Sequence, residues 1–313
     1  MVVLSLCDGM SCGQIALKEL GFNIEKYYAS EIKPYAIQTT QYNFPNTIQL
    51  GDVNKIHYNN GIIYSENGIY LEQKIDLVMF GSPCQSFSIA MPTHKRNGLE
   101  DKTRSGLFYE CERIRKEVSP TYWFVENVAS MKNSDKTILS QILECEPYTF
   151  DASDIGYVHR KRYYWTNIAN ITTLEKKNYK FQNLLENGYT SREKGTTILC
   201  VPYLRPSRGV FAHYRGEKRF LDLIYKSKEH YEECRKLAKQ KDKEEIKNDY
   251  RNGKLPIFDD IRMLNCNELK KAHEIPEWYD MSFLEAKYQG DLIGDGWHIG
   301  IIKHIFKNIP KEL

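Results

Sequence analysis

The amino-acid sequence predicts an α/β protein built on a mostly parallel sheet, and three observations support that class. Residues Val2 to Leu6 are apolar and β-branched without alternation, as in a strand that is buried on both faces. A glycine-bearing turn at 7–13 follows this run and leads into a helical pattern from Ile15 to Leu20. Apolar runs of the same kind recur at 75–80 and 122–125 and alternate with helical segments, which is typical of parallel sheets.

Three acidic residues lie in the first turn and around the next two predicted strands, where ligands commonly bind. Asp8 lies in the glycine turn, Glu31 ends the strand 26–30, and Asp52 lies in the strand 48–53. An acid at the end of the second strand commonly accepts hydrogen bonds from ribose hydroxyls, and Asp52 could accept from an adenine amino group. Asp8 would repel a phosphate, which favours a ligand with a cationic or hydroxyl group. Each acid, taken singly, is more often a helix cap or a solvated side chain.

Cys84 lies in a loop directly after an apolar run. The run 75–80 is predicted to be a short buried strand that Gly81 ends, and Pro83 then fixes φ and cannot join a sheet ladder. Cys84 is therefore presented at the carboxyl edge of the sheet, where open α/β folds bind ligands. Its thiol is either a nucleophile or a small buried hydrophobe. The polar stretch 86–105 that follows looks mobile and is a candidate lid over the thiol.

Further charged groups end strands of the same predicted sheet. The strand 122–125 runs into Glu126, and the predicted strand 159–165 carries Arg160 and Arg162 on one face at period two. Because these residues and the cysteine loop all lie at or beside strand ends, they can converge. The remaining elements of this region are predicted helices at 34–43, 107–118 and 138–145.

Length and composition indicate a globular chain. With 313 residues, of which 41% are hydrophobic and 27% charged, the sequence suits one large domain plus a smaller one. No apolar run approaches the roughly 18 residues that a membrane span requires, and the first residues lack the pattern of a signal peptide. The eight cysteines form no CxxC pairs and have no histidine partners at zinc spacing, so neither a metal site nor a disulfide framework is predicted. Reduced thiols in a cytosol fit best.

Charge is unevenly distributed along the chain. Residues 192–254 contain 17 Lys and Arg against 10 Asp and Glu, so this segment carries a formal charge of +7 and the remainder carries −4. Such a segment suggests a polyanion partner, although a solvated helix explains the charge equally well. Residues 227–252 are predicted to form one long charged helix with a narrow apolar seam. The loops before it, at 195–198 and 202–209, interleave Arg and Tyr and suit phosphate and major-groove contacts.

The motifs, taken in order, resemble those of the DNA cytosine-5 methyltransferases. Pro-Cys and Glu-Asn-Val are individually common, but their joint order and spacing are specific. The resemblance covers residues 1–168 and resumes from about Arg262. Gly-Asp-Gly-Trp at 294–297 stands where Gly-Asn-Ser-Val is usual, which is similar to the branch that includes animal de novo enzymes and many phage or bacterial orphans. The matching segments are 8–13, Glu31, Asp52, 83–85, 126–128 and 160–162.

The resemblance implies a Rossmann-like fold of S-adenosylmethionine-dependent methyltransferases, with a mostly parallel seven-stranded sheet and a smaller target-recognition domain. Residues 1–168 and 261–313 would form the catalytic domain, and 169–260 the target-recognition domain. S-adenosylmethionine would be the cofactor, S-adenosylhomocysteine its product, and double-stranded DNA the partner. No metal and no membrane are implied. The setting would be the cytoplasm of a bacterium or of a phage-infected host, where such enzymes often serve restriction-modification.

The resemblance also implies catalytic roles. In this family a cysteine thiolate adds to C6 of cytosine, which makes C5 nucleophilic toward the methyl donor. Cys84 would supply that thiolate, and the positive charge of Arg162 would favour it. Glu126 would hydrogen-bond N3 and the exocyclic amine, and Asn127 would orient the cysteine loop. Arg160 and Arg162 would hold the base carbonyl and the Glu126 carboxylate. Because the ring lies inside a duplex, the target base must be flipped out.

Two sets of binding residues follow from the same resemblance. Besides Gly-Asp-Gly-Trp, two further features depart from the family: Cys7 stands where an aromatic residue is usual, and the ninth motif after Arg262 lacks its glutamine. The residues implied to contact DNA are Gln85, Ser86, Ser88, Arg205 and Arg208. The residues implied to line the cofactor pocket are Cys7, Asp8, Gly9, Met10, Ser11, Cys12, Glu31, Ile32, Asp52, Val53, Gly81, Asp295, Gly296 and Trp297.

Two other functions are also compatible with the sequence. The same thiolate chemistry could act on RNA or on a free cytidine nucleotide, although a tRNA enzyme would be expected to lack a long basic recognition segment. Alternatively, the chain could be a non-catalytic DNA-binding homologue. Such proteins usually lose the nucleophile or the cofactor loop, whereas this sequence keeps both.

Overall fold

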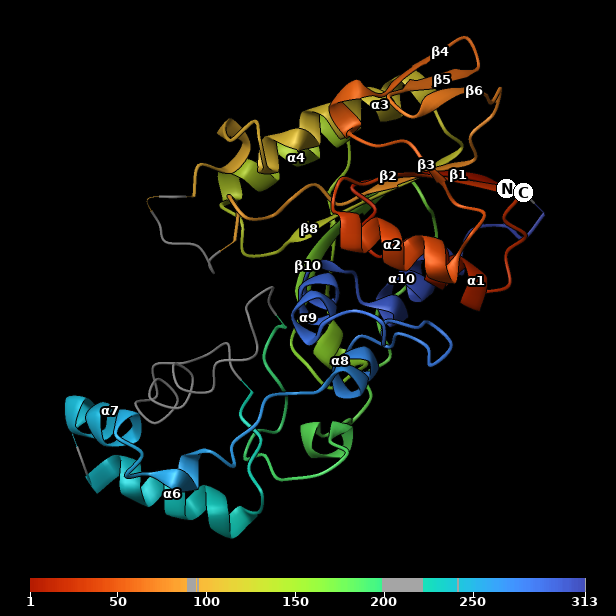
Figure 1. Cartoon of the computed structure of the whole chain (residues 1–313). Coiled ribbons are helices and arrows are strands. Elements are labelled where there is room, and N and C mark those ends of the chain that lie inside the picture. Colours follow the sequence, from red (N-terminus) through yellow and green to blue (C-terminus); the bar gives the residue numbers. More distant parts are fainter. Residues whose placement is uncertain (89–93, 95, 199–221, 241, 313) are drawn as a thin grey trace. The chain divides into compact units, whose positions relative to one another are not determined.

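The computed structural model describes residues 1–88, 94, 96–198, 222–240 and 242–312. The chain divides into two compact units, and the ribbon can be followed from end to end in Figure 1. The first unit comprises Met1–Asp151, Lys161–Leu174 and Gly296–Leu313. The second comprises Ala152–Arg160 and Glu175–Asp295.

A seven-stranded sheet forms the centre of the first unit. Its strands span Val2–Leu6 (β1), Lys26–Ser30 (β2), Ile48–Gln49 (β3), Leu77–Phe80 (β7), Tyr122–Val128 (β8), Tyr148–Asp151 (β9) and Lys161–Thr166 (β10). They lie in the order β3-β2-β1-β7-β8-β10-β9. The first five strands of that order pair in parallel, whereas β10 runs antiparallel to both β8 and β9. The predicted α/β class with a mostly parallel sheet is confirmed.

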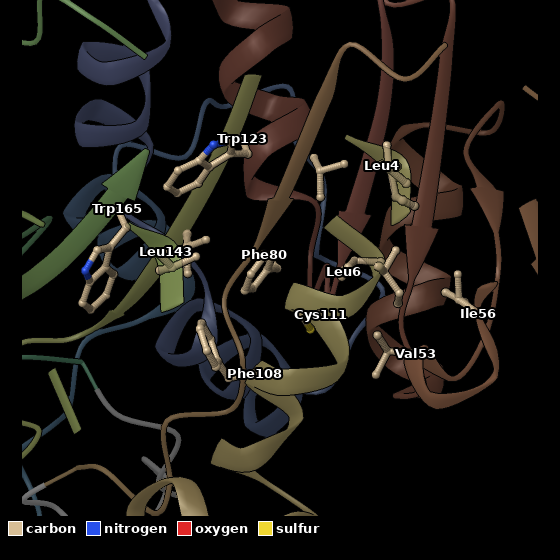
Figure 2. Packing of buried hydrophobic residues seen from close by; sticks show 14 of the residues in the cluster. Leu4, Leu6, Val53, Ile56, Phe80, Phe108, Cys111, Trp123, Leu143 and Trp165 are labelled. Carbon is tan, nitrogen blue, oxygen red and sulfur yellow. The ribbon is translucent and has the colours of Figure 1, made fainter. Parts of the chain in front are cut away.

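Helices cover both faces of this sheet. They span Cys12–Glu19 (α1), Pro34–Asn43 (α2), Phe108–Val118 (α3), Asn133–Leu143 (α4) and Ile299–Phe306 (α10). Trp123 of β8 packs in a buried cluster with Phe108 and Leu143, from α3 and α4 (Figure 2). The next residue, Phe124, contacts Phe306 of α10 with ring centroids 5.2 Å apart. Successive residues of one strand thus face opposite helical layers, as a parallel sheet requires.

Most predicted elements form, with differences at their ends. The helix 34–43 has the predicted bounds, and Pro34 suits a helix start because it has no N–H to leave unsatisfied. Helices α1 and α4 begin before their apolar runs, at Cys12 and Asn133. The predicted strand 48–53 is shorter because Asp52 instead caps a 3-10 helix, its carboxylate accepting a hydrogen bond from Asn54 N at 3.0 Å.

The first unit also contains a small antiparallel sheet that was not predicted. Its strands span His57–Asn59 (β4), Ile62–Ser65 (β5) and Gly68–Leu71 (β6), in that order. Two Asn-Gly dipeptides lie at the connections, and such dipeptides favour two-residue hairpin turns. The first forms the turn between β4 and β5, whereas Glu66 and Asn67 form the second turn and Gly68 begins β6. Asn60 and Gly61 have φ of 48° and 77°, both positive as a type I′ turn requires. The two dipeptides were the available signal for this sheet.

The second unit contains short helices and its own apolar cluster. Its α-helices span Lys228–Gln240 (α6), Lys243–Arg251 (α7), Cys266–Ala272 (α8) and Ala286–Asp295 (α9). The predicted single helix over 227–252 is wrong. Asp242 begins a separate helix, because its carboxylate accepts hydrogen bonds from Glu244 N and Glu245 N at 2.9 and 3.0 Å. The apolar seam was identified correctly, since Cys234 and Ile246 both belong to the cluster.

The boundaries of the compact units differ from the predicted domain boundaries. Residues 261–295 were assigned to the catalytic domain, but they group with the second unit, and the chain returns to the first unit at Gly296. Arg262 illustrates this grouping, because its backbone pairs with Ile224 and its guanidinium donates to Glu268 at 2.7 Å. The functional division into catalytic and target-recognition domains stays a prediction.

Within the part of the chain that the structure describes, every helix is too short or too polar to cross a membrane. The same residues contain no group of three or more His, Cys, Asp and Glu side chains placed to hold a metal ion. The remaining helical elements are 3-10 helices at Val53–Lys55, Gly98–Glu100, Ser105–Leu107, Ala152–Asp154, Phe181–Leu184 and Pro256–Phe258.

Replacing Trp165 with alanine should destabilise the first unit by about 3–5 kcal/mol, because the side chain is fully buried and its indole N–H donates to Ser140 Oγ at 3.0 Å. The control Tyr42→Ala removes an aromatic side chain that is 62% exposed and should change the free energy of unfolding by about 0.5 kcal/mol or less. Denaturant unfolding followed by circular dichroism compares the two. Equal losses in both variants would contradict this packing.

Candidate active site

The predicted nucleophile lies in a loop that follows β7, here called the Cys84 loop and comprising residues 81–88. Cys84 is partly buried and packs at the margin of the apolar cluster of the first unit. Its carbonyl oxygen accepts hydrogen bonds from Phe87 N at 3.0 Å and Ser88 N at 2.9 Å. The chain therefore forms a turn directly after the thiol, and Phe87 is buried beneath it.

Glu126 and Arg162 form an ion pair at the end of β8. Arg162 Nε lies 3.0 Å from Glu126 Oε1, and both residues are only 9% exposed. In the sheet Tyr164 lies opposite Glu126 and Arg162 lies opposite Val128, so the pair is formed by diagonal neighbours on adjacent strands. Arg162 reaches this carboxylate because β10 lies directly beside β8, whereas Arg160 precedes β10, which begins at Lys161.

Asn127 connects β8 to the Cys84 loop. Its side-chain Nδ2 donates to both the carbonyl and the hydroxyl of Ser82 at 3.2 Å, and its side-chain Oδ1 accepts from Val128 N at 2.8 Å. The residue is 1% exposed. Asn127 therefore contacts the Cys84 loop, and its role in orienting the thiol stays a prediction.

Arg160 has partners in the second unit. Its guanidinium donates to the carbonyl oxygens of Ile198 and Gly294, at 3.4 and 3.1 Å, and the residue is 3% exposed. Its neighbour in the predicted pair, Arg162, binds Glu126 in the first unit. The two arginines therefore have different environments, and a contact of Arg160 with a base carbonyl stays a prediction.

Residues beyond the Cys84 loop form hydrogen bonds with it that no sequence pattern indicated. Arg96 donates to Phe87 O and to Ser130 O, both at 3.1 Å, and so links the loop to the chain beyond β8. Asp101 accepts from Ser86 Oγ at 2.7 Å. Residues 89–93 and 95 of the predicted lid lie outside the described residues, so closure over the thiol stays a prediction.

The turn after β1 has unusual backbone geometry. Cys7 and Ser11 have φ of 54° and 57°, in a left-handed region that side chains with a Cβ rarely adopt. Gly9 has a φ of 60°, and a Cβ built on it would meet no atom within 4 Å. The space over Gly9 is therefore open, so a ligand can approach the backbone there.

Asp8 is the most perturbed carboxyl group of this turn. Its carboxylate accepts hydrogen bonds from Tyr27 OH at 2.7 Å and from the Ser11 hydroxyl. Burial raises the pKa of Asp8 to about 6, and the negative charge of Glu31 adds to the effect, while the hydrogen bonds lower it. Its charge therefore changes between weakly acidic and neutral conditions.

Glu31 holds the same turn from the end of β2. Its Oε2 accepts from Gly9 N at 2.8 Å, and its Oε1 accepts from Ile32 N and Lys33 N at 2.8 and 2.9 Å. Asp52 is partly buried and caps the turn that follows β3. Asp52 thus serves as a helix cap, and Glu31 binds backbone N–H groups of two neighbouring turns. Both acids follow neighbouring strands, and their contact with the cofactor stays a prediction. Among the neighbouring predicted residues, Ile32 is 68% exposed, whereas Val53, Met10 and Cys12 are buried.

Trp297 brings the end of the chain to the same edge of the sheet. Its backbone N–H donates to Cys12 Sγ at 3.2 Å, and its ring lies 5.1 Å from that of Phe124. A Cβ on Gly81 would lie 2.9 Å from the indole nitrogen and 3.2 Å from Glu126 Oε2. Only glycine at position 81 therefore lets the indole and this carboxylate approach the start of the Cys84 loop. Of the other two predicted residues here, Gly296 is buried in the first unit and Asp295 is exposed in the second.

Cys7 occupies the position where the family usually has an aromatic residue. Its sulfur lies 4.0 Å from that of Cys111 on α3, which is fully buried. The hydrogen bond with the Cys7 thiol raises the pKa of Cys111, and burial adds to the rise. The turn between β1 and α1 therefore contacts α3 through these two thiols.

The residues predicted to contact DNA differ in their exposure to solvent. Gln85 is exposed and Ser88 partly buried, whereas Ser86 is buried and its hydroxyl donates to Asp101. Arg205 and Arg208 lie outside the described residues. DNA contacts of all five stay predictions.

Known methyltransferases are similar to this chain in sequence. The type II methyltransferase M.HpaII of Haemophilus parainfluenzae is 28% identical over 241 residues, which is 73% of this chain and 60% of that protein. The orphan methyltransferase M.Rho11sI of Bacillus phage rho11s is 31% identical over 230 residues, which is 72% of this chain and 39% of that protein. The chain thus matches less than two thirds of the length of either relative.

Solved structures share the fold over the whole chain. Dnmt2 methyltransferase of S. pombe has a TM-score of 0.63 at 12% identity and covers 98% of this chain and 97% of its own. A mutant of Spodoptera frugiperda DNMT2 has a TM-score of 0.62 at 17% identity and covers 98% of each chain. At such identities the likeness shows the fold alone.

A family model described as C-5 cytosine-specific DNA methylase matches residues 1–311. This match spans nearly the entire sequence and includes the Cys84 loop, the Glu126–Arg162 pair and the turn after β1. The chain therefore belongs to the family of C-5 cytosine-specific DNA methylases.

Proposed function

We propose that this protein is a DNA cytosine-5 methyltransferase, which transfers a methyl group from S-adenosylmethionine to C5 of a cytosine flipped out of double-stranded DNA. The observation that carries the proposal is at the end of β8. There Glu126 pairs with Arg162, and the next residue, Asn127, binds the loop that bears Cys84. One residue of β8 thus supplies the acid, and the next residue binds the loop that carries the nucleophile.

The chemistry requires both groups. Carbon C5 of cytosine is a weak nucleophile, so the Cys84 thiolate adds to C6 and forms a covalent adduct in which C5 becomes electron-rich. Glu126 hydrogen-bonds N3 and the exocyclic amine, where charge changes during the attack. After C5 accepts the methyl group, loss of the C5 proton and elimination of the thiolate restore the aromatic ring. Arg162 keeps Glu126 oriented throughout, and the low exposure of the pair strengthens its field.

The turn after β1 fits the methyl donor. S-adenosylmethionine supplies a methyl group on a positively charged sulfur, together with a ribose and an adenine. The open space over Gly9 admits a ligand to the backbone, and Asp8 and Glu31 provide negative charge beside it. Glu31 and Asp52 would bind the ribose and adenine, and the exposed Ile32 would pack on the adenine ring. The free thiols among the described residues suit a reducing compartment, such as the cytoplasm of a bacterium or a phage-infected host.

Expression in a bacterial host without cytosine methylation tests the reaction and the nucleophile together. Base-resolution mapping of cytosine modification should show modified cytosines in one short sequence context with the wild-type protein. Cys84→Ala should abolish them, because no other step makes C5 nucleophilic. Cys145→Ala, which changes another partly buried thiol of the first unit, should leave the pattern intact. Unmodified DNA despite folded wild-type protein would favour an RNA or nucleotide substrate, or a non-catalytic homologue.

Glu126→Gln separates chemistry from cofactor binding. The amide keeps the shape but lacks the charge that stabilises the attacked ring, so the methylation rate should fall about a hundredfold or more. Affinity for S-adenosylhomocysteine should stay within about twofold, because the turn after β1 is unchanged. Glu110→Gln, which breaks a partly exposed ion pair on α3, is the matched control and should keep full activity. A larger loss in cofactor affinity than in rate would refute the assigned role of Glu126.

Asp8→Asn tests the charge of the cofactor turn through its pH dependence. The pKa of Asp8 is raised to about 6, so the carboxyl is mostly neutral below that pH and ionised above it. Only the ionised form attracts a cation. The ratio of affinities for S-adenosylmethionine and for its uncharged-sulfur product should therefore rise about three- to tenfold from mildly acidic to neutral pH. Calorimetric titration should show this rise in the wild type and a constant ratio in Asp8→Asn. A constant ratio in the wild type would contradict the prediction.

A further inference from the structure

Ser105 contacts the backbone on both sides of Cys84. The residue begins the 3-10 helix Ser105–Leu107 and is fully buried. Its hydroxyl donates a hydrogen bond to the carbonyl oxygen of Pro83 at 2.8 Å and accepts one from Ser86 N at 3.2 Å. Pro83 immediately precedes the thiol residue, and Ser86 follows it by two positions.

We propose that Ser105 is a positioning residue for the nucleophile, which it serves by fixing the backbone of Cys84 from both directions. This proposal rests on the proposed function for its meaning in catalysis. A hydroxyl suits the task because one oxygen both donates and accepts, whereas an alkyl group of similar size does neither. Without it, a buried carbonyl and a buried amide would lose their shared partner.

The position of the hydroxyl is itself fixed. The N–H of the following residue, Gly106, donates to Asp101 O at 2.8 Å, and a Cβ on that glycine would collide with Asp101 O and Leu99 O at 2.8 and 2.9 Å. The turn that carries Ser105 therefore closes tightly on the segment before it. That segment is also tied to the Cys84 loop by the bond between Asp101 and Ser86.

The other anchors of the loop act at different atoms. Asn127 holds Ser82 from β8, and Arg96 holds Phe87 O from the opposite end. Only Ser105, among these contacts, spans the thiol itself. With Pro83 and Ser86 fixed, the sulfur retains rotation about its own side-chain bonds, while the backbone cannot shift it relative to a bound base. Displacement of a reacting atom by about 1 Å can reduce a rate about a hundredfold.

The test compares Ser105→Ala with Ser105→Thr, which keeps the hydroxyl, and with Thr103→Ala, which removes a hydroxyl from the same segment outside the contact with Pro83 and Ser86. Single-turnover methylation of duplex DNA should slow by about ten- to a hundredfold in Ser105→Ala. Affinities for DNA and S-adenosylhomocysteine should stay within about twofold. Ser105→Thr should recover most of the rate, and Thr103→Ala should match the wild type.

A second measurement does not depend on methylation. Alkylation of Cys84 by iodoacetamide, followed by mass spectrometry, should be at least about threefold faster in Ser105→Ala, because a partly buried thiol on a less anchored loop is more accessible. If Ser105→Ala does not fold, Ser105→Cys replaces it, since a thiol of similar size is a much weaker donor. Wild-type alkylation and turnover rates in the folded variant would overturn the proposal. Absence of methylation by the wild type would instead overturn the proposed function and leave the alkylation result to judge Ser105.

Discussion

The buried ion pair between Glu126 and Arg162 is the interaction on which the candidate site depends most. Two charges at this exposure have lost most of their water, and removing one partner of such a buried ion pair typically costs about 3–5 kcal/mol. The pair joins β8 to the one antiparallel strand among its neighbours in the sheet. With the end of β8 fixed in this way, the amide of Asn127 is aimed at Ser82, and the Cys84 loop is placed relative to the carboxylate.

The turn after β1 has a strained backbone, and hydrogen bonds rather than an ion pair stabilise it. Cys7 and Ser11 adopt left-handed conformations that cost of order 1–2 kcal/mol each. The bonds from Gly9 N to Glu31 and from the Ser11 hydroxyl to Asp8 offset that cost. Burial of Asp8 raises its pKa to about 6, and the hydrogen bonds that shape the turn oppose this rise.

Sequence patterns predicted the features that follow local rules. Continuous apolar residues identified β1, and Pro34 marked a helix start. The family resemblance, and not a pattern in the residues, implied the contact of Arg162 with Glu126. Features that depend on a hydrogen bond between one side chain and the backbone were missed or predicted wrongly. Asp242 splits a helix whose apolar seam continues through it, because a cap overrides periodicity. Arg96 and Ser105 lie in a polar stretch without any period, so their bonds to the Cys84 loop follow only from tertiary structure.

The density of these bonds around Cys84 has a consequence for how the reaction is organised. Side chains from β8 and from residues 96–105 bind the backbone of the loop at Ser82, Pro83, Ser86 and Phe87. Ordering each residue costs about 1–2 kcal/mol of conformational entropy, and here that cost is met when the chain folds. Substrate binding then does not have to supply it. A nucleophile held in advance leaves the base as the moving partner, which agrees with a reaction in which cytosine leaves its duplex to reach the thiol.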